Sequence, residues 1–260
     1  MNSWSMPPSS FNIDWLEEIE VGQLLLAQQP VVSSAGGVEA LYAECLARFM
    51  TDTGEVLRAE RFYPSVLHQP DLRALDRAVL LQVLNALEAD DAAVLGCNIC
   101  GNYLKDGAAW ISIIDLMEER PALLDRLVLE FSQTEPFEDL EMVSGMIDLV
   151  RSLGCRVALD DFGAGIASPT LLHLIDFDIV KIDGTFVQDL KQKRGGQTSL
   201  RHLVGFASCF VPVVVVDGIE TAEHSNAARS AGATHQQGFH HGMPELFPIG
   251  SAPMRPRVDA

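Results

Sequence analysis

Acidic residues follow two short apolar segments in the second half of the chain. One segment ends in Asp160-Asp161-Phe162-Gly163, and the other carries Val180-Lys181-Ile182-Asp183. Carboxylates at the ends of buried strands are unfavourable unless they pair with a cation or bind a metal. An Asp that caps a following helix would explain one acidic residue in the first segment, but not a neighbouring pair. The two segments therefore predict a metal site.

Polar residues also stand at the expected ends of most other apolar segments. With the pair above, the set comprises Glu44, Asn98, Glu130, Asp160, Asp161, Lys181, Asp183, Asp217 and Gln237. Carboxylate and amide oxygens suit hard divalent ions, so the set favours Mg²⁺ or Mn²⁺. Two adjacent carboxylates can share a pair of ions about 4 Å apart, an arrangement used for in-line attack on a phosphodiester. Lys181 would then orient the attacking water or neutralise charge in the transition state.

These residues need a framework that brings strand ends together. Apolar strands are expected up to residue 32 and near 40–49, 93–98, 127–131, 156–160, 178–182, 212–216 and 234–237. Amphipathic helices are expected near 12–20, 71–89, 110–118, 137–153, 168–175, 197–208 and 222–231. Eight strands alternating with helices predict an α/β protein with a (β/α)8 TIM-barrel-like fold. In that fold the strands end at one common active-site face.

The chain of 260 residues is long enough to bury the core of one large domain. It shows no internal repeat and no clear linker. We therefore expect an N-terminal segment over residues 1–20, one barrel domain over 21–248 and a C-terminal tail over 249–260.

Composition excludes several classes of partner. The formal net charge of −18 argues against binding to DNA or RNA polymers, which requires a basic face. No apolar run is long enough to span a membrane, and the start lacks the features of a signal peptide. Five cysteines, an odd number, fit free thiols and a cytoplasmic location. Cys97 and Cys100 have the spacing of a zinc or redox pair, but without a second pair a packing role is favoured.

Eight spaced motifs over residues 22–244 resemble those of the EAL family of cyclic di-GMP phosphodiesterases. The motifs are Gln29-Pro30-Val31-Val32, Glu44-Cys45-Leu46-Ala47-Arg48, Cys97-Asn98-Ile99-Cys100, Leu129-Glu130-Phe131-Ser132-Gln133, Asp160-Asp161-Phe162-Gly163-Ala164-Gly165, Lys181-Ile182-Asp183-Gly184-Thr185-Phe186-Val187, Asp217-Gly218-Ile219-Glu220-Thr221 and Gln237-Gly238-Phe239. A literal Glu39-Ala40-Leu41 also occurs. The signature needs an Arg four residues after its Glu, so Glu44 is expected to be the signature residue and Glu39 an exposed turn residue.

The resemblance implies a role for each site residue and an EAL-type barrel that binds two Mg²⁺ or Mn²⁺ ions. Glu44, Asn98, Glu130 and Asp160 would hold one ion, and Asp160, Asp161 and Asp217 the second. Lys181 would contact the nucleophilic water, and Arg48 a substrate phosphate. The nucleotide would lie against Gln29, Leu46 and Pro244, with Asp183 and Gln237 lining the site. Lys181, Asp161 and Asp217 would be the catalytic residues.

Two functions follow from the resemblance. The first is metal-dependent hydrolysis of cyclic di-GMP to the linear dinucleotide pGpG. The second is a receptor that binds cyclic di-GMP or a regulatory protein partner without useful hydrolysis, with a homodimer as a further expectation. The receptor is suggested by three departures from the family pattern: Asp217 and Gln133 stand where the family has Glu, and the loop Ala164-Gly165-Ile166-Ala167-Ser168 loses the family's Thr and Tyr-Ser hydroxyls.

Overall fold

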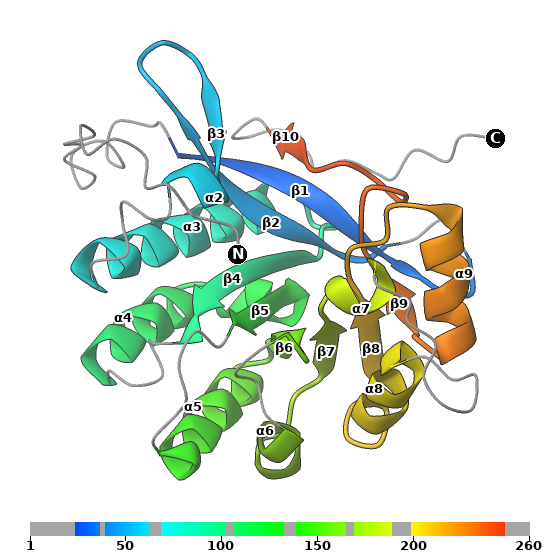
Figure 1. Cartoon of the computed structure of the whole chain (residues 1–260). Coiled ribbons are helices and arrows are strands. Elements are labelled where there is room, and N and C mark those ends of the chain that lie inside the picture. Colours follow the sequence, from blue (N-terminus) through cyan, green and yellow to red (C-terminus); the bar gives the residue numbers. More distant parts are fainter. Residues whose placement is uncertain are drawn as a thin grey trace.

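Strands drawn from most of the chain form a closed barrel with helices around it (Figure 1). The structure, a computed structural model, describes residues 24–36, 40–62, 69–101, 107–132, 139–164, 169–188 and 199–247. In spatial order the barrel strands are β1 (Leu24–Ser33), β2 (Ala40–Met50), β4 (Leu95–Cys100), β5 (Leu127–Ser132), β6 (Arg156–Phe162), β7 (Ile179–Ile182), β8 (Val213–Val216) and β9 (His235–Gln236). Pairing of β9 with β1 closes the ring. The predicted barrel is confirmed.

Helices follow most of the strands. They are α2 (Ala59–Phe62), α3 (Gln69–Ala89), α4 (Gly107–Glu118), α5 (Leu140–Ser152), α6 (Pro169–Leu174), α7 (Thr185–Gln188), α8 (Ser199–Ala207) and α9 (Ala222–Ala231), with the 3-10 helix η3 (Pro121–Arg126) before β5. Two short strands, β3 (Val56–Arg58) and β10 (Glu245–Phe247), pair with β2 and β1 outside the ring. The expected helix at 12–20 and the tail at 249–260 lie outside the described residues.

The first strand departs from the expected alternation of strands and helices. β1 runs antiparallel to both of its barrel neighbours, β2 and β9. Only residues 34–39 separate β1 from β2, which is too short for the helical crossover that two parallel strands require. The antiparallel register places Gln29 opposite Glu44. This pairing brings two of the predicted site residues side by side.

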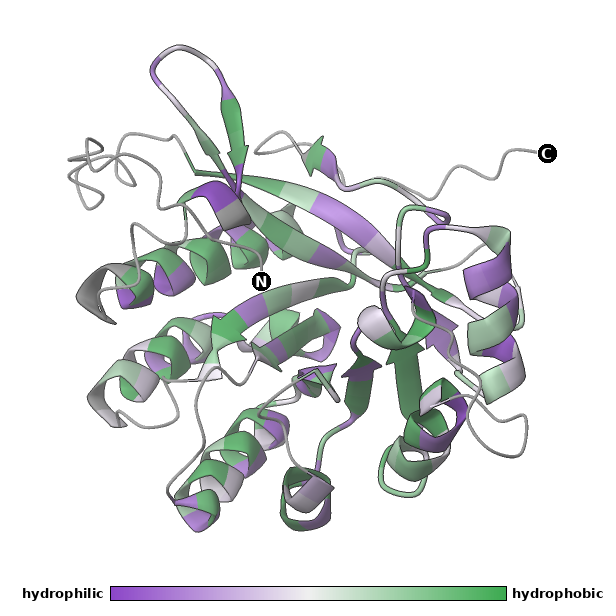
Figure 2. Ribbon diagram, in the orientation of Figure 1, coloured by the Kyte–Doolittle hydropathy of each residue, from purple (hydrophilic) through white to green (hydrophobic). Residues whose placement is uncertain are grey.

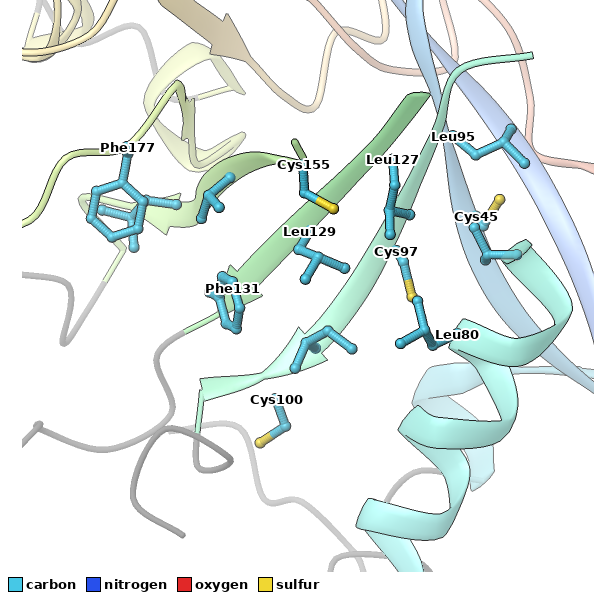
Figure 3. Close-up of a cluster of buried hydrophobic side chains, with 14 of the residues drawn as sticks. Cys45, Leu80, Leu95, Cys97, Cys100, Leu127, Leu129, Phe131, Cys155 and Phe177 are labelled. Carbon is cyan, nitrogen blue, oxygen red and sulfur yellow. The ribbon is translucent and has the colours of Figure 1, made fainter. Parts of the chain in front are cut away.

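The outer surface of the strands packs against the helices. Figure 3 shows a section of this layer, in which cysteines and leucines of neighbouring strands lie beside Leu80 of α3. Cys45, Cys97, Cys100 and Cys155 are free and buried, while Cys209 is free and exposed. Cys97 and Cys100 therefore act as small apolar side chains, as expected.

β7 and β8 show why the parallel part of the barrel forms. Both consist of aliphatic residues apart from Lys181 (Figure 2). Both are also buried along almost their whole length. Strands covered on both faces need such sequences, whereas the surrounding helices carry both hydrophobic and hydrophilic residues. Lys181 is the exception, because it places a cation inside the barrel.

The barrel interior has an apolar floor beneath its polar residues. The floor is a cluster of inward-facing side chains from six strands, namely Val31, Tyr42, Val128, Ala158, Ile179 and Val215. Tyr42 is the largest of them, and it fits because Gly96 on the neighbouring strand has no side chain. A methyl group added at Gly96 would lie 2.7 Å from Tyr42 Cε2 and would also collide with Glu130 Oε1. Gly96 is therefore needed for space rather than for backbone freedom.

We predict that Gly96→Ala destabilises the protein by about 1–3 kcal/mol, the usual penalty for overpacking a core. Chemical denaturation followed by circular dichroism measures this change. Gly145→Ala is the matched control, because a methyl group there meets no atom within 4 Å and Ala favours the helix by about 0.5–1 kcal/mol over Gly. Equal stability of Gly96→Ala and wild type would contradict the close packing at this position.

Candidate metal centre

The ammonium of Lys181 lies at the centre of a buried group of carboxylates. Its Nζ is 2.8 Å from Glu44 Oε2, 2.5 Å from Glu130 Oε2 and 3.5 Å from Asp160 Oδ1. The four side chains come from β2, β5, β6 and β7, so residues far apart in sequence meet because their strands share one barrel. Glu130 and Lys181 are almost completely shielded from water, at 0% and 1% exposure. The structure brings together four of the residues that the sequence analysis expected at one site.

Amides complete the ring around Glu44. Asn98 Nδ2 donates a hydrogen bond of 2.7 Å to Glu44 Oε1, and Gln237 Nε2 donates one of 2.6 Å to Glu44 Oε2. Gln237 Nε2 is also 3.5 Å from Gln29 Oε1, and Gln29 Nε2 donates to the carbonyl of Gly242. Each of these amides was expected at the site, and together they hold the Glu44 carboxylate in one orientation.

Asp160 and Asp161 are adjacent but point into different surroundings. The strand pairing of β6 with β7 is irregular between Leu159 and Phe162, and Asp161 has a left-handed backbone with φ of +53°. Asp160 Oδ1 accepts a hydrogen bond from the Asp161 backbone N–H. As a result Asp160 joins the buried group while Asp161 is exposed.

Asp183 and Asp217 follow β7 and β8 in two loops that touch each other. The loops meet at Gly184 and Gly218, where a methyl group on either glycine would come within 3.0 Å of the other backbone. Asp217 Oδ1 accepts from its neighbour Gly218 N–H at 2.6 Å, and Asp183 Oδ1 accepts from the backbone of Thr185. Both carboxylates therefore cap their own loops, and neither makes a hydrogen bond to the Lys181 group in the described structure.

Burial and mutual repulsion shift the protonation of the group. Burial, with the nearby Glu44, holds the pKa of Glu130 well above its ordinary value, and burial likewise raises the pKa of Asp160. Burial alone would raise the pKa of Glu44 too, but the Lys181 ammonium and the amide hydrogen bonds lower it. Burial would lower the pKa of Lys181, but the three carboxylates raise it well above its ordinary value. Lys181 is therefore charged.

The carboxylates of Asp161 and Asp217 are protonated more easily than isolated aspartates. Although the Asp161 side chain reaches solvent, partial desolvation of its carboxylate, followed by the charges of Asp160 and Asp183, raises its pKa to about 6. Burial also raises the pKa of Asp217 to about 6, against the attraction of Lys181. Negative charge thus accumulates on this side of the site beyond what Lys181 compensates.

The donor set fits a hard divalent cation. Within the described ranges, the group of acidic ligands whose oxygens all lie within 4.8 Å of one another is Glu44, Glu130 and Asp160. Glu130 Oε1 is buried without a hydrogen-bond partner, and the Asn98 amide is attached to the same group. Oxygen ligands of this kind suit Mg²⁺ or Mn²⁺. Asp161 and Asp217, expected to bind a second ion, lie outside this group.

The residues expected to bind nucleotide lie along β2 and beside β1. Leu46 and Arg48 follow Glu44 on the same face of β2, so Arg48 is about 13 Å beyond Glu44 along the strand. Arg48 Nη1 donates to the carbonyl of Ala47. Pro244 is half-buried just before β10, whose Glu245 pairs with Gln28 of β1. Glu39 lies outside the described residues.

A cavity of about 410 Å³ opens beside the metal centre. It is lined on one side by Glu44, Asn98, Asp160 and Asp161, and on the other by apolar residues of α3 and by Asp76. Asp76 is buried and accepts a hydrogen bond of 2.9 Å from the Cys100 backbone N–H. The sequence analysis missed Asp76, although helical spacing places it beside Leu72 and Val79. It also missed Tyr42, although period-two alternation places Tyr42 on the face of Glu44.

Comparisons with known proteins bear on this site. The curated relatives include a probable cyclic di-GMP phosphodiesterase PdeA of Escherichia coli strain K12, 27% identical over 233 residues, which are 87% of this chain and 31% of the relative. Another is the cyclic di-GMP phosphodiesterase PdeF of the same organism, 23% identical over 234 residues, 88% of this chain and 31% of the relative. The chain spans about a third of the length of these relatives.

Solved structures share the fold. An EAL domain protein from Listeria monocytogenes has a TM-score of 0.75 at 24% identity, covering 93% of this chain and 95% of the other. The EAL domain of Xanthomonas citri FimX, crystallised with cyclic di-GMP, has a TM-score of 0.75 at 20% identity, covering 91% and 94%. The family model for the EAL domain matches residues 13–244. This match, which covers most of the chain, shows that the chain belongs to the EAL domain family.

Proposed function

We propose that the chain is a metal-dependent phosphodiesterase that hydrolyses cyclic di-GMP to the linear dinucleotide pGpG. The observation that carries this proposal is the group of Glu44, Glu130 and Asp160 around Lys181, with the amide of Asn98 attached. Relatives named as cyclic di-GMP phosphodiesterases support it at the level of the family. A buried excess of carboxylates is unfavourable in itself, so a divalent cation is the natural counter-charge.

Each side chain of the site would have a role set by its position. Glu44, Asn98, Glu130 and Asp160 would hold one ion, and Asp160, Asp161 and Asp217 a second. Bound Mg²⁺ or Mn²⁺ ions would supply an activated water and stabilise charge on the phosphate. Lys181 would orient a water for attack on phosphorus, which would break one ribose 3′ P–O bond, and the leaving 3′ oxygen would take a proton from that water.

The nucleotide would extend from the metal centre along β2. Arg48 would pair with a phosphate oxygen, since guanidinium groups bind phosphate through paired hydrogen bonds. Gln29, Leu46 and Pro244 would contact the nucleotide, and Asp183 and Gln237 would line the site. Gln237 hydrogen-bonds both to Glu44, which would bind the ion, and to Gln29, which would contact the nucleotide. This double contact supports binding of the ion and the nucleotide side by side.

A receptor function is the second candidate, and one observation favours it. Asp217 caps its own loop and lies outside the group of close carboxylates, with a side chain one methylene shorter than Glu. If the second ion is held weakly, the barrel would bind cyclic di-GMP, a protein partner or a second copy of itself without efficient hydrolysis. Either function would operate in the cytoplasm, a location that free buried cysteines support. None of the described helices is long and apolar enough to cross a membrane.

We predict that Glu44→Gln weakens Mn²⁺ binding at least tenfold and abolishes hydrolysis, because the neutral amide removes a charged ligand without changing its size. Calorimetry with Mn²⁺ measures binding, and chromatography of cyclic di-GMP incubated with purified protein and Mn²⁺ or Mg²⁺ measures hydrolysis. Glu39→Ala, at the other Glu-x-Leu sequence, should change neither property. A larger loss in Glu39→Ala than in Glu44→Gln would show that the wrong glutamate had been assigned.

We further predict that Asp217→Glu raises the rate of hydrolysis, because the longer side chain reaches a second ion more easily. Adding Gln133→Glu should raise it again. Affinity for cyclic di-GMP should change much less, since Gln29, Arg48 and Pro244 are untouched. Single-turnover kinetics and equilibrium nucleotide binding separate the two effects. If wild type already hydrolyses quickly and Asp217→Glu is slower, Asp217 is a competent ligand and the receptor function is excluded.

A further inference from the structure

Tyr42 is a buried polar side chain to which the proposed reaction gives no role. It is 1% exposed, and its phenolic oxygen is without a hydrogen-bond partner in the described structure. An unpaired buried polar group costs about 1–3 kcal/mol. Phenylalanine would fill the same space without that penalty, so the hydroxyl needs an explanation of its own.

The ring of Tyr42 lies close to Glu130, one of the carboxylates around Lys181. Tyr42 precedes Glu44 by two residues on β2, so both side chains face the barrel interior. The ring edge lies beside Gly96, at the same place where Glu130 Oε1 approaches Gly96 from β5. Tyr42 thus forms the floor directly under the Glu130 carboxylate.

Glu130 supplies the complementary group. Its Oε2 is held by Lys181 at 2.5 Å, whereas its Oε1 is buried and also without a partner. A donor and an acceptor, both unsatisfied, therefore occupy the same part of the barrel floor. Within the described residues, no group donates a hydrogen bond to Glu130 Oε1.

The charges around Tyr42 keep its hydroxyl protonated. The groups that act on it are Glu130, Lys181, Glu44 and Asp160. Burial, reinforced by the nearby carboxylates, holds the pKa of Tyr42 well above its ordinary value. The phenol is therefore neutral and can donate a hydrogen bond to a neighbouring oxygen.

We propose that Tyr42 is a positioning residue of the metal centre: when an ion binds, its hydroxyl donates to Glu130 Oε1, which is without a partner in the absence of the ion, and fixes the orientation of that carboxylate. The inference rests on the proposed function only in requiring an ion at this centre. Groups that hold a metal ligand in place typically contribute 10–100-fold to metal affinity. Tyr42 would thus raise the affinity for the ion without touching the ion or the nucleotide.

The test is Tyr42→Phe, which keeps the ring and removes the hydroxyl alone. Without metal, the variant should be as stable as wild type or slightly more stable, because an unpaired hydroxyl is gone. Calorimetry without nucleotide should show Mn²⁺ affinity reduced by about tenfold. The rise in melting temperature caused by saturating Mn²⁺ should be correspondingly smaller than in wild type.

Ser34→Ala is the matched control, because Ser34 also has a buried hydroxyl without a partner. Ser34 lies just after β1, five residues beyond Gln29, which is the residue paired with Glu44. The Mn²⁺ affinity of Ser34→Ala should equal that of wild type. Wild-type affinity in Tyr42→Phe, or an equal loss in both variants, would overturn the proposal, as would a wild-type protein that binds no Mn²⁺. Mn²⁺ binding that depends on Tyr42 but is accompanied by no hydrolysis would refute the enzyme and leave the role of Tyr42 intact.

Discussion

The contact of the Lys181 ammonium with buried carboxylates constrains the structure around it. Taking Glu44 and Glu130 out of water is unfavourable by several kcal/mol for each charge unless partners replace the water. One ammonium and the amides of Asn98 and Gln237 provide those partners, and each comes from a different strand or loop. The strands must therefore close in the correct register before the charges are compensated. A site that compensates charge incompletely is well suited to accept a small divalent cation.

Much of the fold and of the centre could be predicted because the apolar segments that mark buried strands are also the segments that carry the charged residues. Apolar strands that end in carboxylates identified Glu130, Asp160 and Lys181, and the barrel brings them together as expected. The direction of β1 was not foreseen, since hydrophobic pattern gives no strand direction; the short connection before β2 was the available signal. Tyr42 was missed because an aromatic residue in an apolar strand is ordinarily part of the core. The role proposed for Tyr42 depends on an unpaired hydroxyl oxygen, which only the structure shows.

The two halves of the centre differ in how firmly the fold holds them. Glu44 and Glu130 project from the middle of paired strands, where the backbone ladder fixes their positions. Asp161 lies at a backbone irregularity and Asp217 in a loop, and partial desolvation raises the pKa of each to about 6. Loops tolerate change more readily than paired strands. Changes in the loop residues would therefore alter the half of the centre with Asp161 and Asp217 while the buried half with Glu44 and Glu130 persists.

The antiparallel direction of β1 also has a consequence for folding. Its pairing with β2 joins residues close in sequence, so this hairpin can form early and locally. Its pairing with β9 joins Val32 to Gln236, about 200 positions away, and such contacts form slowly because a long loop must close. The β1 edge of the hairpin therefore stays unpaired until β9 and β10 have formed. During synthesis that edge is the surface most exposed to mispairing, and chaperones are expected to act there.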